Sequence, residues 1–194
     1  MLHLGFGYRY NDFKEGLRTS ATPETNQAPS FLASGFIDNV DRSHTYNYEL
    51  SWRKGQNWLH AEHINVDIDD SAFGELAFSG YHISFSHILT GEMRSYNRRS
   101  GIFNRIQIAR PVNQNGWGAW EVGVRYSHTD LSDGPIKGGE MDIWTLGLNW
   151  WLRKDIMTSI NWRHVELDKP PQQALAPVRG QSSGWTSRVV LILD

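Results

Sequence analysis

The chain has 194 residues, enough for a single domain spanning 1–194, and its 19 Lys and Arg residues nearly balance its 21 Asp and Glu residues, which leaves a formal net charge of −2. This charge creates no field that would attract nucleic acid, and no segment approaches the roughly 20 apolar residues of a membrane-spanning helix. Cysteine is absent, which excludes disulfides and thiolate metal sites.

Alternation of large apolar side chains with small or polar ones is the dominant pattern of the chain. In residues 119–128, Trp120, Val122, Val124 and Tyr126 alternate with small or charged residues. Because successive side chains of a strand point to opposite faces, this segment is predicted to be a strand with one apolar and one polar face. Eight such strands are predicted in chain order, at residues 2–11, 46–53, 58–67, 81–89, 119–128, 144–150, 159–163 and 188–193.

The third predicted strand, residues 58–67, has a blurred pattern. Apolar residues occur on both of its faces, with Leu59 and Ala61 on one and Ile64, Val66 and Ile68 on the other.

The connections between the predicted strands differ in length and composition. Pro, Gly and polar residues predict long loops, and short polar segments predict turns. The long loops are 13–44 and 168–183, and the short turns are 54–56 and 153–155.

Residues 91–118 remain outside this series, although residues 102–109 have the pattern of a ninth strand. Repeated strands with one apolar and one polar face, and aromatic residues near the ends of the apolar face, predict a transmembrane β-barrel. In outer-membrane barrels the extracellular loops are long and the periplasmic turns are short. If the last strand ends on the periplasmic side, eight strands place 13–44 outside and 54–56 inside, whereas a ninth strand would invert both. We therefore expect 91–118 to be a non-spanning, Arg-rich segment on the periplasmic side.

Fourteen of the 19 basic residues are arginine, whose planar fork matches phosphate and carboxylate. Five lie within predicted strands, on the face opposite the apolar stripe: Arg9, Arg53, Arg125, Arg163 and Arg188. Five more would line the lumen if the non-spanning segment folded into it: Arg94, Arg98, Arg99, Arg105 and Arg110. All ten are candidates for anion binding, and generic lumen charge is an equally good reading of the strand arginines. Three acids, Glu49, Glu62 and Glu121, also point inward and would orient the arginines.

No catalytic or metal-binding motif is complete. Residues 60–63, with the sequence His-Ala-Glu-His, suggest a metal site, but His60 and His63 face opposite sides of a strand. His82 and His87 would likewise face opposite sides of their strand. The chain has no nucleophile elbow and no pair of acids in a defined pocket. We therefore predict no metal, no cofactor and no enzymatic activity.

Several sequence blocks carry a family resemblance. They are residues 78–81, 89–92, 101–103, 116–121, 125–127 and 144–150, together with Arg94 and Tyr96. These blocks resemble the phosphate-selective porin O and P family, most closely over residues 76–167. The resemblance implies a sixteen-stranded, trimeric outer-membrane channel for phosphate, polyphosphate or similar anions. It also implies that this chain is the C-terminal half of such a channel.

The predicted fold is all-β, an antiparallel transmembrane β-barrel of which about eight strands are present. No signal peptide precedes the first strand, so we expect the chain to be a fragment. The expected function is passive diffusion of phosphate-like anions through the outer membrane of a Gram-negative bacterium, with membrane lipid and a homotrimer as partners. The first alternative is a soluble β-sandwich that binds carbohydrate through surface tryptophans. The second is an outer-membrane barrel enzyme, for which the sequence supplies no nucleophile and base.

Overall fold

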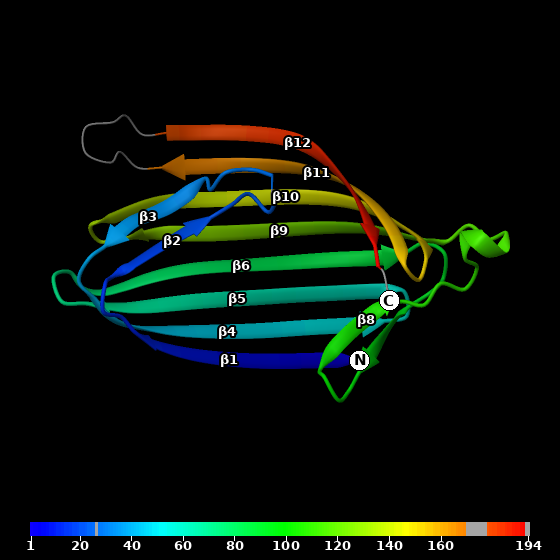
Figure 1. Cartoon of the computed structure of the whole chain (residues 1–194), viewed down its shortest axis with the longest axis horizontal. Coiled ribbons are helices and arrows are strands. Elements are labelled where there is room, and N and C mark those ends of the chain that lie inside the picture. The colour runs from blue at the N-terminus through cyan, green and yellow to red at the C-terminus, as the bar shows by residue number, and fades with distance from the viewer. Residues whose placement is uncertain (26, 170–177, 193–194) are drawn as a thin grey trace.

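The computed structural model describes residues 1–25, 27–169 and 178–192, which form one eight-stranded antiparallel sheet and two hairpins (Figure 1). The sheet has the order β1–β4–β5–β6–β9–β10–β11–β12. Its strands are β1 (Leu2–Asp12), β4 (Val40–Lys54), β5 (Asn57–Asp70), β6 (Gly74–Ile88), β9 (Ala119–Asp133), β10 (Ile136–Arg153), β11 (Ile156–Lys169) and β12 (Val178–Leu191). The hairpins are β2 (Leu17–Ala21) with β3 (Leu32–Ile37), and β7 (Arg94–Asn97) with β8 (Ile102–Ile106). The prediction of an all-β, antiparallel, eight-stranded fold is confirmed.

The sheet is not closed into a barrel. In the described part of the chain, β1 pairs only with β4 and β12 only with β11, and the two strands lie at opposite edges (Figure 1). The described strands of this chain therefore form an open sheet, and the predicted transmembrane barrel is not closed within them. An eight-stranded barrel has an interior just wide enough for side chains. The two hairpins that lie against the inner face of this sheet would not fit inside it.

The two ends of the sheet carry different connections. The turns at residues 55–56 and 154–155 lie at one end, called the short-turn end, whereas the long connection from β1 to β4 lies at the other, the long-connection end, together with the turns at 71–73 and 134–135 (Figure 1). Residues 89–118 leave the sheet at the short-turn end, where β7 and β8 pair with each other and not with the wall. The pattern at 102–109 therefore belongs to a hairpin strand. Of the predicted loop 168–183, residues 170–177 lie outside the described residues, and the remainder belongs to β11 and β12.

The predicted loop at residues 13–44 contains the β2–β3 hairpin and the start of β4, so that prediction was incomplete. The hairpin packs on the inner face of the sheet at the long-connection end. Leu32 and Ile37 of β3 are fully buried there among apolar residues of the sheet: Val40, Ile68, Leu76, Phe78, Leu131, Met141, Ile143 and Val165. Removing this apolar surface from water stabilises the docked hairpin.

The hairpin also explains the blurred pattern of the third predicted strand. The register pairs Ile64 with Asn47 and Ile68 with Ser43, which places both isoleucines on the inner face. Ile68 is fully buried in the core beneath the hairpin, and Val66 packs against that core. Val66 and Ile68 on the second face of β5 are therefore covered by protein, whereas Ile64, beyond the hairpin, is 39% exposed.

The outer face of the sheet is apolar and exposed. The large exposed side chains on this face include Leu4, Phe6, Tyr81, Ile83, Phe85, Val122, Trp144, Leu146, Ile160, Trp185 and Val189. Aromatic pairs border this band. Tyr126 and Trp144 lie with ring centroids 4.9 Å apart toward one end, and Trp120 stacks on Trp150 at 5.0 Å toward the other. Among the described residues, no helix is long and apolar enough to cross a membrane.

Candidate anion-binding site on the inner face

The register places the five strand arginines on the inner face, opposite the apolar band. Side chains of directly opposed residues share a face. Arg125 pairs with Ser84 on β6 and with Thr145 on β10, and Thr145 in turn pairs with Arg163 on β11. Arg125 and Arg163 thus lie in one cross-strand row, two strands or about 10 Å apart. The remaining three pair as follows: Arg9 with Thr45, Arg53 with Trp58, and Arg188 with Ser159.

Arg125 is held by a carboxylate of the segment that joins β2 to β3. Its Nε donates to Oε1 of Glu24 at 2.8 Å, across 101 residues of sequence. Glu24 has a positive φ of 54°, an unfavourable conformation for a residue with a side chain. The docked hairpin maintains this conformation and so presents the carboxylate to Arg125. The positive charge of Arg125 is therefore largely offset.

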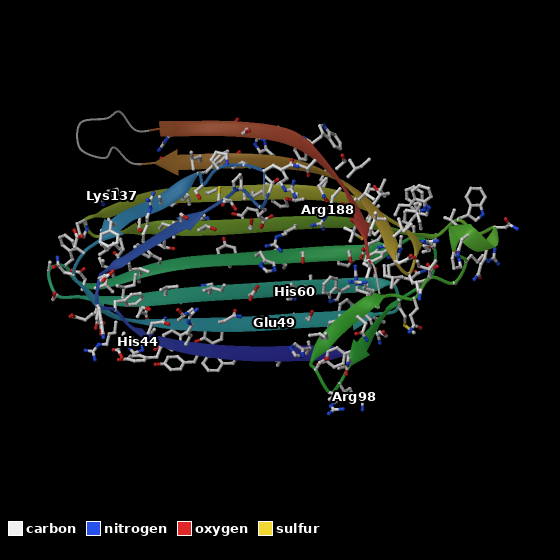
Figure 2. The ribbon with its side chains drawn as sticks, in the orientation of Figure 1. His44, Glu49, His60, Arg98, Lys137 and Arg188 are labelled. Atoms are coloured by element: carbon white, nitrogen blue, oxygen red, sulfur yellow. The ribbon has the colours of Figure 1, made fainter. Side chains whose placement is uncertain are left out.

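Arg163 and Arg188 form the basic patch of the inner face. Nη1 of Arg163 donates to Oγ1 of Thr186 at 2.6 Å, and its buried Nε has no partner among the described residues. Arg188 is exposed two residues beyond Thr186, toward the short-turn end of β12 (Figure 2). In the part of the chain that the structure describes, neither guanidinium forms an ion pair. An anion that reaches this patch meets two cations, and the carboxylate of Glu24, which acts on Arg163 from nearby, is already ion-paired with Arg125.

Open space adjoins the basic patch. Gly184 lies directly opposite Arg163 in the β11–β12 register, and an added Cβ at this position would meet no atom of the described residues within 4 Å. The spacing leaves room for an anion beside the guanidinium. Guanidinium groups bind planar or tetrahedral oxyanions through two parallel N–H donors, which is the chemistry that this patch offers.

Arg53 and Arg9 serve local contacts. Arg53 donates from Nη1 to the carbonyl oxygen of Arg94, and its buried Nε has no partner among the described residues. Arg9 donates from Nε to Oδ1 of Asn11 at 3.0 Å and is exposed near the β2–β3 hairpin. Arg53 therefore helps to position the β7–β8 hairpin, and Arg9 retains a solvated charge on the inner face.

Arg94 is buried and neutralised rather than presented to the lumen. Its Nη2 donates to both carboxylate oxygens of Glu121, and its guanidinium lies 4.7 Å from the ring centroid of Trp58. Two more side chains, Ser86 and Asn149, donate to the same carboxylate at 2.8 and 3.1 Å. The structure thus uses Arg94 to attach β7 to the wall of the sheet.

The other four arginines of residues 91–118 are exposed. The hairpin lies over the inner face, because Tyr96 forms a 2.6 Å hydrogen bond with His3 and Phe103 packs on Trp58. Arg98 lies at its tip, directed away from the sheet (Figure 2). The remaining three lie in the same segment, residues 91–118, and are also exposed to solvent: Arg99, Arg105 and Arg110. These charges surround the short-turn end rather than the row of strand arginines.

Sequence reasoning missed one cluster on the inner face. His60, Glu62 and His82 each offer one potential metal-ligand atom, and the three atoms all lie within 4.8 Å of one another. Residues 60–63 supply ligands from one strand only, whereas the cluster takes its third ligand from the neighbouring strand. Glu62 and His82 are directly opposed on neighbouring strands, and the antiparallel register between 58–67 and 81–89 is the signal that could have revealed the pair.

A comparison with protein families matches residues 2–178 to the phosphate-selective porin O and P model. The chain belongs to the phosphate-selective porin O and P family. This confirms the resemblance carried by the sequence blocks, and the family is one of channels rather than enzymes. An uncharacterized protein of Caulobacter vibrioides is 29% identical to this porin chain over 154 residues. That match covers 77% of this chain and 31% of the length of the relative, so the chain spans about a third of that protein.

Proposed function

We propose that this chain forms part of the wall of an outer-membrane porin through which phosphate-like anions diffuse passively. The observation that carries the proposal is the division of the sheet into two faces. The outer face is a band of exposed apolar side chains, and the inner face holds Arg163 and Arg188 without carboxylate partners. A surface that contacts lipid must be apolar, as the outer face is. The wall of an aqueous path for anions must be polar and carry cations, as the inner face does.

The height of the apolar band supports a membrane setting. The two aromatic borders on β9 are six residues apart, from Trp120 to Tyr126, which is about 20 Å of extended strand. Transmembrane barrels carry an apolar band about 25 Å tall between two aromatic girdles. Tyr and Trp rings at such borders place an apolar ring in the hydrocarbon and a polar atom in the headgroup region.

The open edges of β1 and β12 support a larger barrel. In a bilayer, every unpaired backbone group costs several kcal/mol, so strands at a free edge are unstable there. We infer that both edges pair with further strands of a longer protein, in a sixteen-stranded barrel that assembles as a homotrimer in the outer membrane. The 31% coverage of the Caulobacter vibrioides relative fits a chain that supplies one part of a longer wall.

The arrangement disfavours the soluble alternative. A β-sandwich would cover the apolar face with a second sheet, whereas in the described residues the outer band carries no second layer. Trp120 and Trp150 stack on each other at the border of this band, where an interfacial aromatic girdle would lie. A folded, detergent-free monomer would contradict the proposed membrane function.

The test is an ion-selectivity measurement on the full-length protein in planar bilayers. Under a salt gradient, we expect a reversal potential that shows preference for chloride over potassium. Added inorganic phosphate should reduce the chloride current, because phosphate would occupy the same guanidinium groups. A cation-selective pore would overturn the assignment of an anion channel, and a chloride current insensitive to phosphate would overturn the assignment of phosphate-like anions as its substrates.

A further inference from the structure

A cluster of three metal-ligand side chains lies on the inner face, apart from the basic patch. His60 and Glu62 are two residues apart on β5 and point to the same face, and Glu62 directly opposes His82 on β6. The imidazole rings of His60 and His82 have centroids 5.1 Å apart. One ligand atom from each of the three residues lies within 4.8 Å of the other two.

Neighbouring groups orient each ligand. The Nδ2 of Asn47 donates to Oε1 of Glu62 at 2.8 Å, which leaves Oε2 of Glu62 directed toward Nδ1 of His82 at 3.8 Å. On the other histidine, Nδ1 of His60 forms a 3.2 Å hydrogen bond with Oγ of Ser51. This contact leaves Nε2 of His60 for a ligand. Such outer contacts are typical of metal sites, where they fix the tautomer and the orientation of the ligands.

Two further observations concern the surroundings of the two histidines. Nε2 of His82 is buried and has no hydrogen-bond partner among the described residues, and the His82 side chain is only 12% exposed. Nδ1 of the same ring lies 3.8 Å from Oε2 of Glu62, which is beyond hydrogen-bond distance, so either nitrogen of His82 is available to a ligand, and a buried polar atom is normally satisfied by a partner. Oε1 of Glu49 also lies 3.8 Å from Nδ1 of His60, as in the carboxylate–histidine–metal arrangement (Figure 2).

We propose that His60, Glu62 and His82 bind a divalent transition-metal ion such as Zn²⁺. Two imidazole nitrogens and one carboxylate oxygen are a common ligand set for Zn²⁺, with a fourth position open to water or another ligand. Imidazole ligands disfavour Ca²⁺ and Mg²⁺, which take oxygen ligands. Ligand atoms of a tetrahedral Zn²⁺ site lie about 3.3 Å apart, so small rotations of the side chains complete the geometry.

The pocket around the three ligands has room for an ion, and the charges near it offset one another. The three residues line a pocket of about 500 Å³ beneath the connection from β2 to β3, so an ion and its open position are accessible. Arg125 lines the same pocket, and its 2.8 Å ion pair with Glu24 offsets its charge toward a cation. Glu49 adds a second negative charge beside the ligands.

The experiment titrates Zn²⁺ into the protein in detergent micelles after chelator treatment, using isothermal calorimetry. We expect saturable binding with one Zn²⁺ per chain. His60→Ala and His82→Ala should each weaken binding by roughly tenfold or more, because each removes a ligand. The matched control is His63→Ala, since His63 is exposed on the outer face three residues from His60 and should leave the affinity unchanged.

A second measurement on the unaltered protein does not depend on how the variants fold. Co²⁺ added in place of Zn²⁺ should produce the visible absorption bands of a four-coordinate site, and Zn²⁺ should abolish them by displacement. Absence of saturable Zn²⁺ binding would overturn the proposal. So would loss of affinity in His63→Ala equal to the loss in His60→Ala.

Discussion

Nη2 of Arg94 donates to both carboxylate oxygens of Glu121, at 2.6 and 2.8 Å, and the Glu121 side chain is only 1% exposed. Arg94 belongs to the β7–β8 hairpin and Glu121 to the wall strand β9. The pair therefore attaches the β7–β8 hairpin to the inner face of the sheet. A two-stranded hairpin is marginally stable alone in water, so this contact determines whether β7 and β8 remain ordered.

We predict that Glu121→Gln detaches the β7–β8 hairpin. The glutamine amide has one acceptor oxygen where the carboxylate accepts from Arg94, Ser86 and Asn149. Removing one partner of a buried ion pair costs about 3–5 kcal/mol. Hydrogen–deuterium exchange of residues 94–106 should accelerate by roughly a hundredfold, whereas exchange in the long strands should change little.

The control for this prediction is Glu166→Gln. Glu166 pairs with Asp142 on the outer face, and its side chain is 54% exposed. This substitution should leave exchange in the hairpin unchanged. Equal exchange in Glu121→Gln and the unaltered protein would show that other contacts, such as that between Tyr96 and His3, hold the hairpin.

We predict that Arg163→Gln and Arg188→Gln each reduce the anion selectivity of the channel. A unit charge about 4 Å from a passing ion contributes about 1 kcal/mol in water, so the permeability ratio of chloride to potassium should fall roughly fivefold. Arg179→Gln is the matched control, because Arg179 is 81% exposed and pairs with Asp168 on the outer face. Reversal potentials in planar bilayers measure the ratio. An unchanged ratio in both inner-face variants would contradict the assignment of the basic patch.

Adjacent residues of β9 test which face meets lipid. Val122 is 38% exposed on the outer face, and Gly123 lies on the inner face with ordinary space for a Cβ, 3.5 Å from the nearest atom. Val122→Arg should cost about 2–4 kcal/mol of folding free energy in lipid, because arginine at the bilayer midplane is destabilising by that amount. Gly123→Arg should cost markedly less. Urea unfolding in lipid bilayers measures both, and equal costs would contradict the two-faced wall.

We predict that Leu32→Ala loosens the β2–β3 hairpin. Leu32 is fully buried against the inner face, so removing its side chain creates a cavity and costs about 2–5 kcal/mol. The hairpin would then leave the inner face more often, and single-channel conductance should rise or fluctuate. Phe36→Ala in the same hairpin is the control, since Phe36 is 59% exposed. Equal conductance in Leu32→Ala and Phe36→Ala would show that the hairpin does not obstruct the channel.

The faces of the strands could be predicted from the sequence because side-chain alternation is local. Residues 120–127 define an outer and an inner face without reference to any other part of the chain, and the register agrees with that division. The hairpins could not be predicted in the same way. Leu17, Leu32 and Ile37 are separated by polar residues and prolines, and their burial depends on apolar residues of the sheet far away in sequence. A local sign was the group of apolar residues on the second face of β5, of which Val66 and Ile68 contact the core beneath the hairpin.

Tertiary structure determines which arginines of the inner face are paired with a carboxylate. Arg125 meets Glu24 across 101 residues, and Arg94 meets Glu121 across 27. The amino-acid sequence by itself determined an antiparallel all-β fold with lipid-like and polar faces, because a period of two residues is sufficient to specify a face. Only the folded sheet decided that Arg94 and Arg125 are neutralised and that Arg163 and Arg188 are not. Ion pairing depends on which distant residues the register and the hairpins bring within reach.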